Sequence, residues 1–171
     1  MNIILIGFKG SGKSSVGKLL ASKLGKNFID TDQLIQEQHY LDSEKELKIS
    51  DIYRALGEAK FRNLEEEAIA KLSPIKNSII ATGGGAVLNQ NNIDCLKKIG
   101  TLIYLELSFD ACYSRIKQEA LPAYVDSEEE LTSLYEERTK IYQHTADSTF
   151  QTEHKSIESI VNEIIGAHHG D

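Results

Sequence analysis

A glycine-rich octet directly after a short apolar run near the N-terminus is the feature that most constrains the fold. The apolar run is I-I-L-I at residues 3–6, which is typical of a strand buried on both faces. The octet, residues 7–14, has the sequence G-F-K-G-S-G-K-S and matches the pattern G-x-x-x-x-G-K-[S/T]. Apolar residues at helical spacing follow, from Val16 to Leu24. A strand, a glycine loop and a helix in this order predict a loop whose backbone N–H groups surround phosphate oxygens.

Two side chains of the octet have a predicted chemical role. Lys13 is expected to reach the β- and γ-phosphates of a nucleotide, and the hydroxyl of Ser14 is expected to join the ligands of a Mg²⁺ ion. The alternative is a glycine-rich turn with an exposed lysine. We assign the neighbouring residues in and directly after the motif to the same phosphate site: Gly10, Ser11, Gly12 and Ser15.

Short apolar runs and longer helical patterns alternate along the rest of the chain. Further strands are predicted at residues 27–30, 78–81, 101–105 and 149–151, and one long helical stretch is predicted from about 49 to 72. This alternation predicts an α/β fold with an open parallel sheet and helices on both faces, and the length fits a single domain over residues 1–171. Ligands bind such sheets beyond the carboxyl ends of the strands, so the residues after each strand are the candidate site.

Composition excludes several classes of function. The 26 acidic residues outnumber the 19 basic ones and give a formal net charge of −7, which disfavours a nucleic-acid binder. Two cysteines, Cys95 and Cys112, fit a reducing compartment better than a disulfide framework. The chain has no basic, apolar leader and no apolar run long enough for a membrane span. We therefore expect a cytoplasmic protein, a monomer, that acts on a small molecule.

Two carboxylates follow the second predicted strand. In the sequence Asp30-Thr31-Asp32, one acid is expected to help hold the hydration shell of Mg²⁺. The other is expected to accept the proton of an acceptor hydroxyl. The alternative is helix capping, with Asp30 or Thr31 as the N-cap and Asp32 in the first turn.

Three consecutive glycines, Gly83 to Gly85, follow the third predicted strand. Glycine loses much backbone entropy on folding, so such a run implies a backbone requirement. Either a ligand approaches the backbone closely or the chain makes a tight left-handed turn. The place of the run at the end of a strand favours the ligand.

Taken together, these motifs resemble the shikimate kinase family. The resemblance is carried by the octet, Asp30-Thr31-Asp32, Phe61-Arg62 and Gly83–Gly85 in this order and at these separations. It continues through D-I-Y at 51–53, G-E at 57–58, L-E-L-S at 105–108 and Y-E-E-R at 135–138, and it covers essentially the whole chain. The resemblance implies a P-loop three-layer sandwich with a five-stranded parallel sheet. It also implies transfer of the γ-phosphate of ATP to the 3-hydroxyl of shikimate with Mg²⁺.

The resemblance also implies roles for single residues. Asp32 is similar to the acid that binds and polarises the acceptor hydroxyl, and with Lys13 it forms the expected catalytic pair. The pair Arg62 and Arg138 is similar to the arginines that grip the shikimate carboxylate, for which a planar guanidinium is well suited. Further implied contacts are Gly83 and Gly84 with substrate, Asp30 with the metal through water, and Arg115 and Lys155 near adenine. The alternative for Arg62 is a surface pair with Glu58 or Glu66, and for Arg138 a pair with Glu137 or the acids at 128–130.

One segment departs from the family pattern. The resemblance implies a substrate-binding helical segment at about 31–62 and a mobile lid at about 117–125, where an arginine precedes a proline. Here Leu121 precedes Pro122. Lys117 or Arg115 could supply the missing charge from the lid, or the enzyme could be slow. The alternatives left open are a kinase for another hydroxy-acid such as gluconate, and a regulator that binds ATP and shikimate without turnover.

Overall fold

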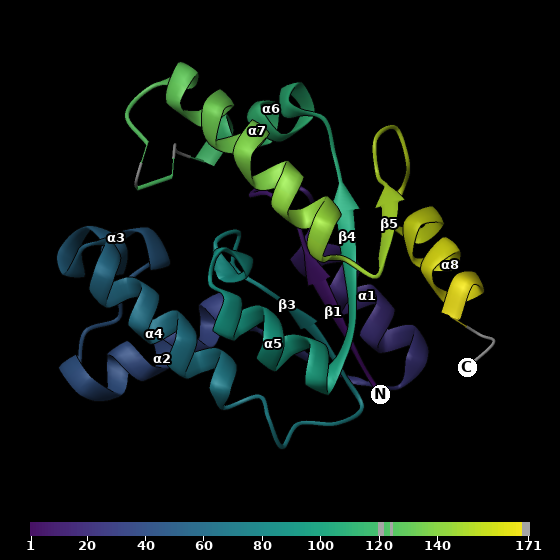
Figure 1. The fold of residues 1–171 in the computed structure, drawn as a ribbon, viewed down its shortest axis with the longest axis horizontal. Coiled ribbons are helices and arrows are strands. Elements are labelled where there is room, and N and C mark those ends of the chain that lie inside the picture. Colours follow the sequence, from purple (N-terminus) through teal and green to yellow (C-terminus); the bar gives the residue numbers. More distant parts are fainter. Residues whose placement is uncertain (120–121, 124, 169–171) are drawn as a thin grey trace.

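The computed structural model describes residues 1–119, 122–123 and 125–168. Its five strands form one parallel sheet in the order β2-β3-β1-β4-β5 (Figure 1). The strands are β1 (Asn2–Ile6), β2 (Asn27–Asp30), β3 (Ser78–Ala81), β4 (Gly100–Glu106) and β5 (Ser148–Gln151). The helices are α1 (Lys13–Leu24), α2 (Thr31–Ser43), α3 (Ile49–Leu56), α4 (Glu58–Ala70), α5 (Gln90–Ile99), α6 (Phe109–Glu119), α7 (Glu128–Thr145) and α8 (Ile157–His168), with a short 3₁₀ helix η1 at Ala86–Leu88.

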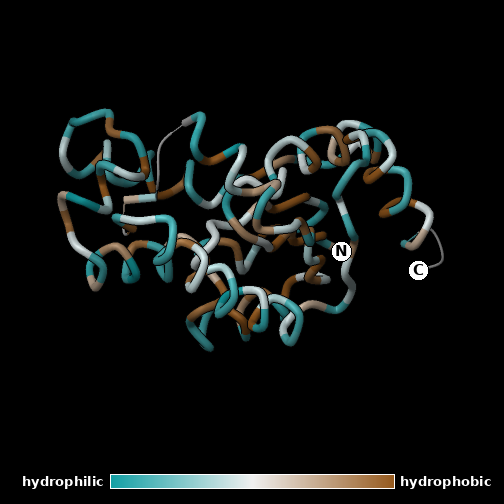
Figure 2. The backbone as a smooth tube through the Cα atoms, turned by 90° about the horizontal axis from the view of Figure 1, so that it is seen from above, coloured by the Kyte–Doolittle hydropathy of each residue, from teal (hydrophilic) through white to brown (hydrophobic). Residues whose placement is uncertain are grey.

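Strand β1 is buried on both faces, as its apolar run predicts. Ile4 and Ile6 pack in a cluster with residues of α5, α6 and α7, whereas Ile3 and Leu5 pack with residues of α1 and α8. The sheet therefore lies between two helical layers, which confirms the predicted three-layer α/β sandwich. Figure 2 shows hydrophobic and hydrophilic residues alternating along the outer helices, as expected for helices with one face on a core.

A third, smaller core joins α2, α3 and α4 at one end of the molecule (Figure 1). It contains Ile35, Ile52, Phe61 and Ala68. The long helical stretch predicted over 49–72 is wrong in one respect, because it is two helices divided at Gly57. Gly57 has a φ of 77°, and its N–H closes α3 on the carbonyl of Tyr53, so α4 begins in a new direction.

The strand register brings three motifs to one edge of the sheet. Ala81, the last residue of β3, pairs with Leu5 of β1 on one side and with Asp30 of β2 on the other. The octet, the two carboxylates and the glycine run therefore leave the sheet at the same level. The strand order also reverses at β1, which is where open parallel sheets bind ligands.

Among the described residues, no helix combines the length and the apolar composition that a membrane crossing requires.

Candidate active site

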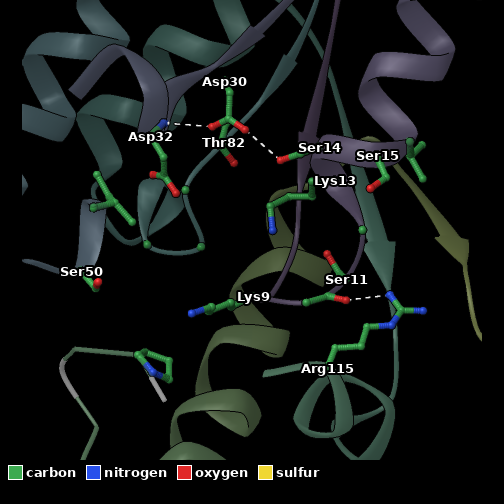
Figure 3. A pocket seen from close by; sticks show the side chains of 18 of the residues that line it. Lys9, Ser11, Lys13, Ser14, Ser15, Asp30, Asp32, Ser50, Thr82 and Arg115 are labelled. Carbon is green, nitrogen blue, oxygen red and sulfur yellow. Dashed lines mark hydrogen bonds between the residues drawn. The ribbon is translucent and has the colours of Figure 1, made fainter. Parts of the chain in front are cut away.

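A cavity of about 630 Å³ opens at the carboxyl ends of β1, β2 and β3. Its volume is in the usual range for a small-molecule site. It is lined by the glycine loop, the Asp30 and Asp32 carboxylates, the glycine run and side chains from α3 and α4 (Figure 3). The predicted residues that line it are Gly10, Ser11, Gly12, Lys13, Ser14, Ser15, Asp30, Asp32, Arg62, Gly83, Gly84, Arg115 and Lys155.

The side chain of Lys13 forms hydrogen bonds with the backbone of the glycine loop. The Nζ atom of Lys13 donates to the carbonyl oxygens of Gly7 at 2.8 Å and Phe8 at 2.9 Å. Gly12, with a φ of 93°, begins α1 without a side-chain cap, so the positive end of that helix faces the cavity. Burial lowers the pKa of Lys13 from 10.5 to about 8, although the nearby Asp32 and Asp30 carboxylates oppose the shift. The loop is therefore an anion site whose lysine keeps its proton up to about pH 8.

Asp30 joins the glycine loop to α2. One carboxylate oxygen accepts a hydrogen bond from the Ser14 hydroxyl at 2.8 Å, and the other caps α2 by accepting from the N–H of Asp32 at 3.1 Å. The helix-capping interpretation of Asp30 is confirmed, whereas its role beside a metal stays a prediction. Ser14 and Asp30 present hard oxygen donors beside the phosphate cradle, which fits Mg²⁺, an ion that takes few protein ligands and completes its shell with water and phosphate. Within the described ranges, no group of three or more metal-binding side chains exists.

Asp32 lines the cavity, and the pKa of its carboxyl is higher than that of an ordinary aspartate. Burial raises the pKa of Asp32 from 3.8 to about 7, the charges of Asp30 and Glu65 add to the rise, and Lys13 and Lys9 oppose it. A carboxylate with a pKa near the operating pH is well matched to accept a proton.

The glycine run is required by side chains that approach its backbone. A Cβ atom on Gly83 would lie 2.6 Å from Oδ1 of Asp32 and 3.2 Å from Oε1 of Glu65, and one on Gly85 would collide with the guanidinium of Arg62. None of the three glycines has a positive φ, so the left-handed turn considered for this segment is wrong. The carbonyl of Gly84 accepts a hydrogen bond from the Tyr142 hydroxyl at 2.6 Å, which anchors the run on α7.

Arg62 is held by a buried carboxylate that sequence reasoning missed. Its Nη1 atom lies 2.9 Å from Oε2 of Glu65, whose side chain is 2% exposed, and its Nε atom lies 3.9 Å from Glu58. The suggested pair with Glu66 is wrong, because Glu66 accepts hydrogen bonds from Asn89 and Asn91 instead. Burial raises the pKa of Glu65, whereas the Arg62 guanidinium lowers it. The signal was available, since Glu65 falls on the apolar stripe of α4.

Arg138 reaches the site from the opposite side, on α7. It is 3% exposed, so the surface pair with Glu137 or the acids at 128–130 does not describe it. Its Nη1 atom lies 3.6 Å from the position of a Cβ on Gly84, and its charge lowers the pKa of Glu65. The structure thus brings Arg62 and Arg138 to the same glycine run from helices far apart in the sequence.

Two predicted cofactor contacts lie at the outer end of the cavity. Arg115 donates to the carbonyl of Gly10 at 2.7 Å, on the far side of the loop from Asp32 (Figure 3). Lys155 pairs with Glu163 at 2.7 Å.

Pro122 and Ala123 of the predicted lid line the cavity, while Leu121 lies outside the described residues. The ammonium of Lys117 lies over the Tyr113 ring, 5.6 Å from its centroid.

Comparisons with known proteins agree with one another. A family model described as shikimate kinase matches residues 9–168. The shikimate kinase of Persephonella marina is 43% identical over 166 residues, with 96% of this chain and 97% of the relative covered. The solved shikimate kinase of Aquifex aeolicus superposes with a TM-score of 0.84 at 37% identity, covering 99% and 97% of the two chains. The Acinetobacter baumannii shikimate kinase, solved in complex with shikimate, superposes with a TM-score of 0.87 at 29% identity, covering 97% and 91%.

Proposed function

This chain belongs to the shikimate kinase family. We propose that it catalyses transfer of the γ-phosphate of ATP to the 3-hydroxyl of shikimate, a step of aromatic biosynthesis. The observation that carries the proposal is the juxtaposition of the Lys13 loop, the Asp32 carboxylate and Arg62 around one cavity, with Arg138 next to Gly84 of its lining. A gluconate kinase and a non-catalytic regulator are not favoured, since relatives such as those of Persephonella marina and Alkaliphilus oremlandii, which span the chain, are shikimate kinases.

The acceptor half of the site fits a small hydroxy-acid. We assign the shikimate carboxylate to Arg62 and Arg138, because planar guanidinium groups hold carboxylates with paired hydrogen bonds. Backbone groups of Gly83 and Gly84 lie beside them, and Asp32 lies next to Gly83. This placement orients the acceptor hydroxyl toward a carboxylate that is able to take its proton.

The donor half of the site fits a nucleoside triphosphate. The glycine loop and the N-terminus of α1 would surround the β- and γ-phosphates, with Lys13 exchanging its two carbonyl contacts for phosphate oxygens. Ser14 and Asp30 would hold Mg²⁺, which when bound neutralises charge on the phosphates. The acceptor oxygen then bonds to the γ-phosphorus, the bond to the ADP oxygen breaks, and the hydroxyl proton goes to Asp32. Arg115 and Lys155 are assigned to the adenosine end.

The direct test measures ADP release by the purified chain with ATP and Mg²⁺, with shikimate, quinate or gluconate as acceptor. We expect ADP release that depends on shikimate, at a rate well above the hydrolysis of ATP alone. The two other acids control for recognition of any hydroxylated carboxylate. Release that depends on gluconate instead would move the activity to another acceptor, and binding of ATP and shikimate with no release would identify a regulator.

The two shifted pKa values predict the pH dependence of kcat/KM for shikimate. Asp32 must lose its proton to act as a base, so kcat/KM should rise with pH up to about 7. Lys13 must keep its proton to neutralise phosphate, so kcat/KM should fall above about 8. Initial rates at low shikimate concentration between pH 5 and 10 measure both the rise and the fall of kcat/KM. A value of kcat/KM that is flat between pH 5 and 7 would contradict the role of Asp32.

The remaining proposals concern the oligomeric state, the cellular location and the moving segments of the protein. We propose a monomer that acts in the cytoplasm, where the free cysteines Cys95 and Cys112 suit a reducing compartment. We also propose that residues 1–171 act as one domain, that the segment 31–62 closes on the acceptor, and that the segment 117–125 closes over the phosphates.

A further inference from the structure

A second lysine of the glycine loop, Lys9, extends into the cavity. Figure 3 shows its side chain on the side of the loop where Ser50 of α3 lies, whereas Arg115 lies on the other side. The main chain at Lys9 packs against the glycine run, because its backbone nitrogen is 3.7 Å from the position of a Cβ on Gly84. Lys9 therefore lies where the phosphate cradle meets the acceptor half of the site.

The backbone on either side of Lys9 is ordered. Directly before Lys9, the carbonyl of Phe8 accepts a hydrogen bond from the N–H of Ser11 at 3.2 Å. Gly10 follows directly, with a φ of 84°. The backbone that carries Lys9 is therefore ordered before a ligand arrives, so only the side chain has to be positioned for electrostatic stabilisation.

The other cations that line the cavity come from other parts of the site. Arg62 is bound to Glu65, Arg115 to the carbonyl of Gly10, and Lys155 to Glu163. Lys13 bonds to two carbonyls of the loop. Lys9 differs in position, since it stands on the acceptor side of the loop and its positive charge acts on the Asp32 carboxylate, lowering the pKa of that acid.

We propose that Lys9 is a further catalytic residue, whose ammonium neutralises the phosphoryl group as it passes from ATP to the acceptor oxygen beside Asp32. The inference rests on the proposed function. In a phosphoryl transfer, charge spreads over the three equatorial oxygens of a loose transition state, and a fixed cation close to these oxygens stabilises the transition state more than the ground state. Lys13 faces the phosphates from the cradle, and Lys9 approaches them from the acceptor side.

The test compares Lys9→Met, which keeps the length of the side chain, with Lys9→Arg, which keeps the charge. The matched control is Lys98→Met, which removes one charge from an exposed residue of α5. We expect Lys9→Met to lower kcat at least tenfold while the KM values for ATP and shikimate change less than threefold. Lys9→Arg should keep at least a third of kcat, and the control should equal the unaltered chain.

Three further measurements separate catalysis from folding and from binding. Thermal unfolding and ADP affinity should be unchanged in Lys9→Met. The affinity for ADP with Mg²⁺ and aluminium fluoride, which imitates the transferring phosphoryl group, should fall at least tenfold.

Three results would overturn the proposal: an unchanged kcat in Lys9→Met, an unchanged affinity for the aluminium fluoride complex, or a raised KM for shikimate with kcat intact. The last would make Lys9 an acceptor anchor instead. Failure of the proposed function is distinguishable, since it would remove shikimate-dependent turnover from the unaltered chain while the aluminium fluoride measurement still decides the role of Lys9.

Discussion

Asp32→Asn is expected to lower kcat for shikimate phosphorylation by about 10²- to 10⁴-fold, the range that a positioned general base contributes. The amide keeps the shape of the carboxylate but cannot accept the hydroxyl proton. The KM for ATP should change little, because the phosphates are held by the glycine loop. Initial rates at saturating ATP and shikimate measure the effect. Asp42→Asn, at an exposed site of the same helix, is the matched control and should leave kcat unchanged.

Stability distinguishes this loss of chemistry from a loss of folding. The folded chain holds the Asp32 proton up to about pH 7, whereas an unfolded chain releases it near 3.8. The free energy of unfolding therefore falls as the pH rises between these values, and the penalty is complete above pH 7. Asp32→Asn removes this penalty, so its Tm relative to the unaltered chain should increase from pH 4 to pH 8. A kcat within threefold of the unaltered chain would exclude Asp32 as the base.

Arg62→Ala is expected to lower kcat/KM for shikimate by at least about 10²-fold, mainly through KM. It removes charge-assisted hydrogen bonds to the acceptor carboxylate, worth about 1.5–3 kcal/mol each. It also leaves the buried Glu65 carboxylate facing a substrate of like charge. Shikimate titrations at saturating ATP measure the change. Arg54→Ala removes an exposed pair with Asp51 on α3 and should have no effect on either constant.

Because Arg62 pairs with the buried Glu65 carboxylate, a second experiment measures the stability of the Arg62 variants. Arg62→Ala should also lower the Tm, because a buried charge loses its partner. Adding Glu65→Gln should restore most of the Tm but not the KM for shikimate, since the amide needs no counter-charge and still cannot bind a carboxylate strongly. A shikimate KM within threefold of the unaltered chain in Arg62→Ala would show that Arg138 alone grips the substrate.

Residues next to strand ends were predictable because their position follows from local pattern. The octet, Asp30, Asp32 and the glycine run each follow an apolar strand, and a parallel sheet places those ends together. The division of the helical stretch at Gly57 was missed, although a glycine inside a helical pattern was a visible signal. Glu65 was missed because apolar spacing alone does not show which charged residue on a buried stripe will find a partner.

The sequence by itself determined the phosphate cradle and the position of the two acids and the glycine run after strands, because each depends on residues that are close together in the chain. The order of the strands depends on pairing between distant segments, and Arg62 and Arg138 were identified only through the family resemblance. Only the tertiary structure decided how they work as a site. Packing of α4 and α7 against the sheet selects Glu65 as the partner of Arg62, buries Arg138, and places the Arg62 guanidinium where Gly85 leaves room for it. The pKa of Asp32 depends on the same packing, because burial and charges from β2, α4 and the glycine loop act together only after the chain has folded.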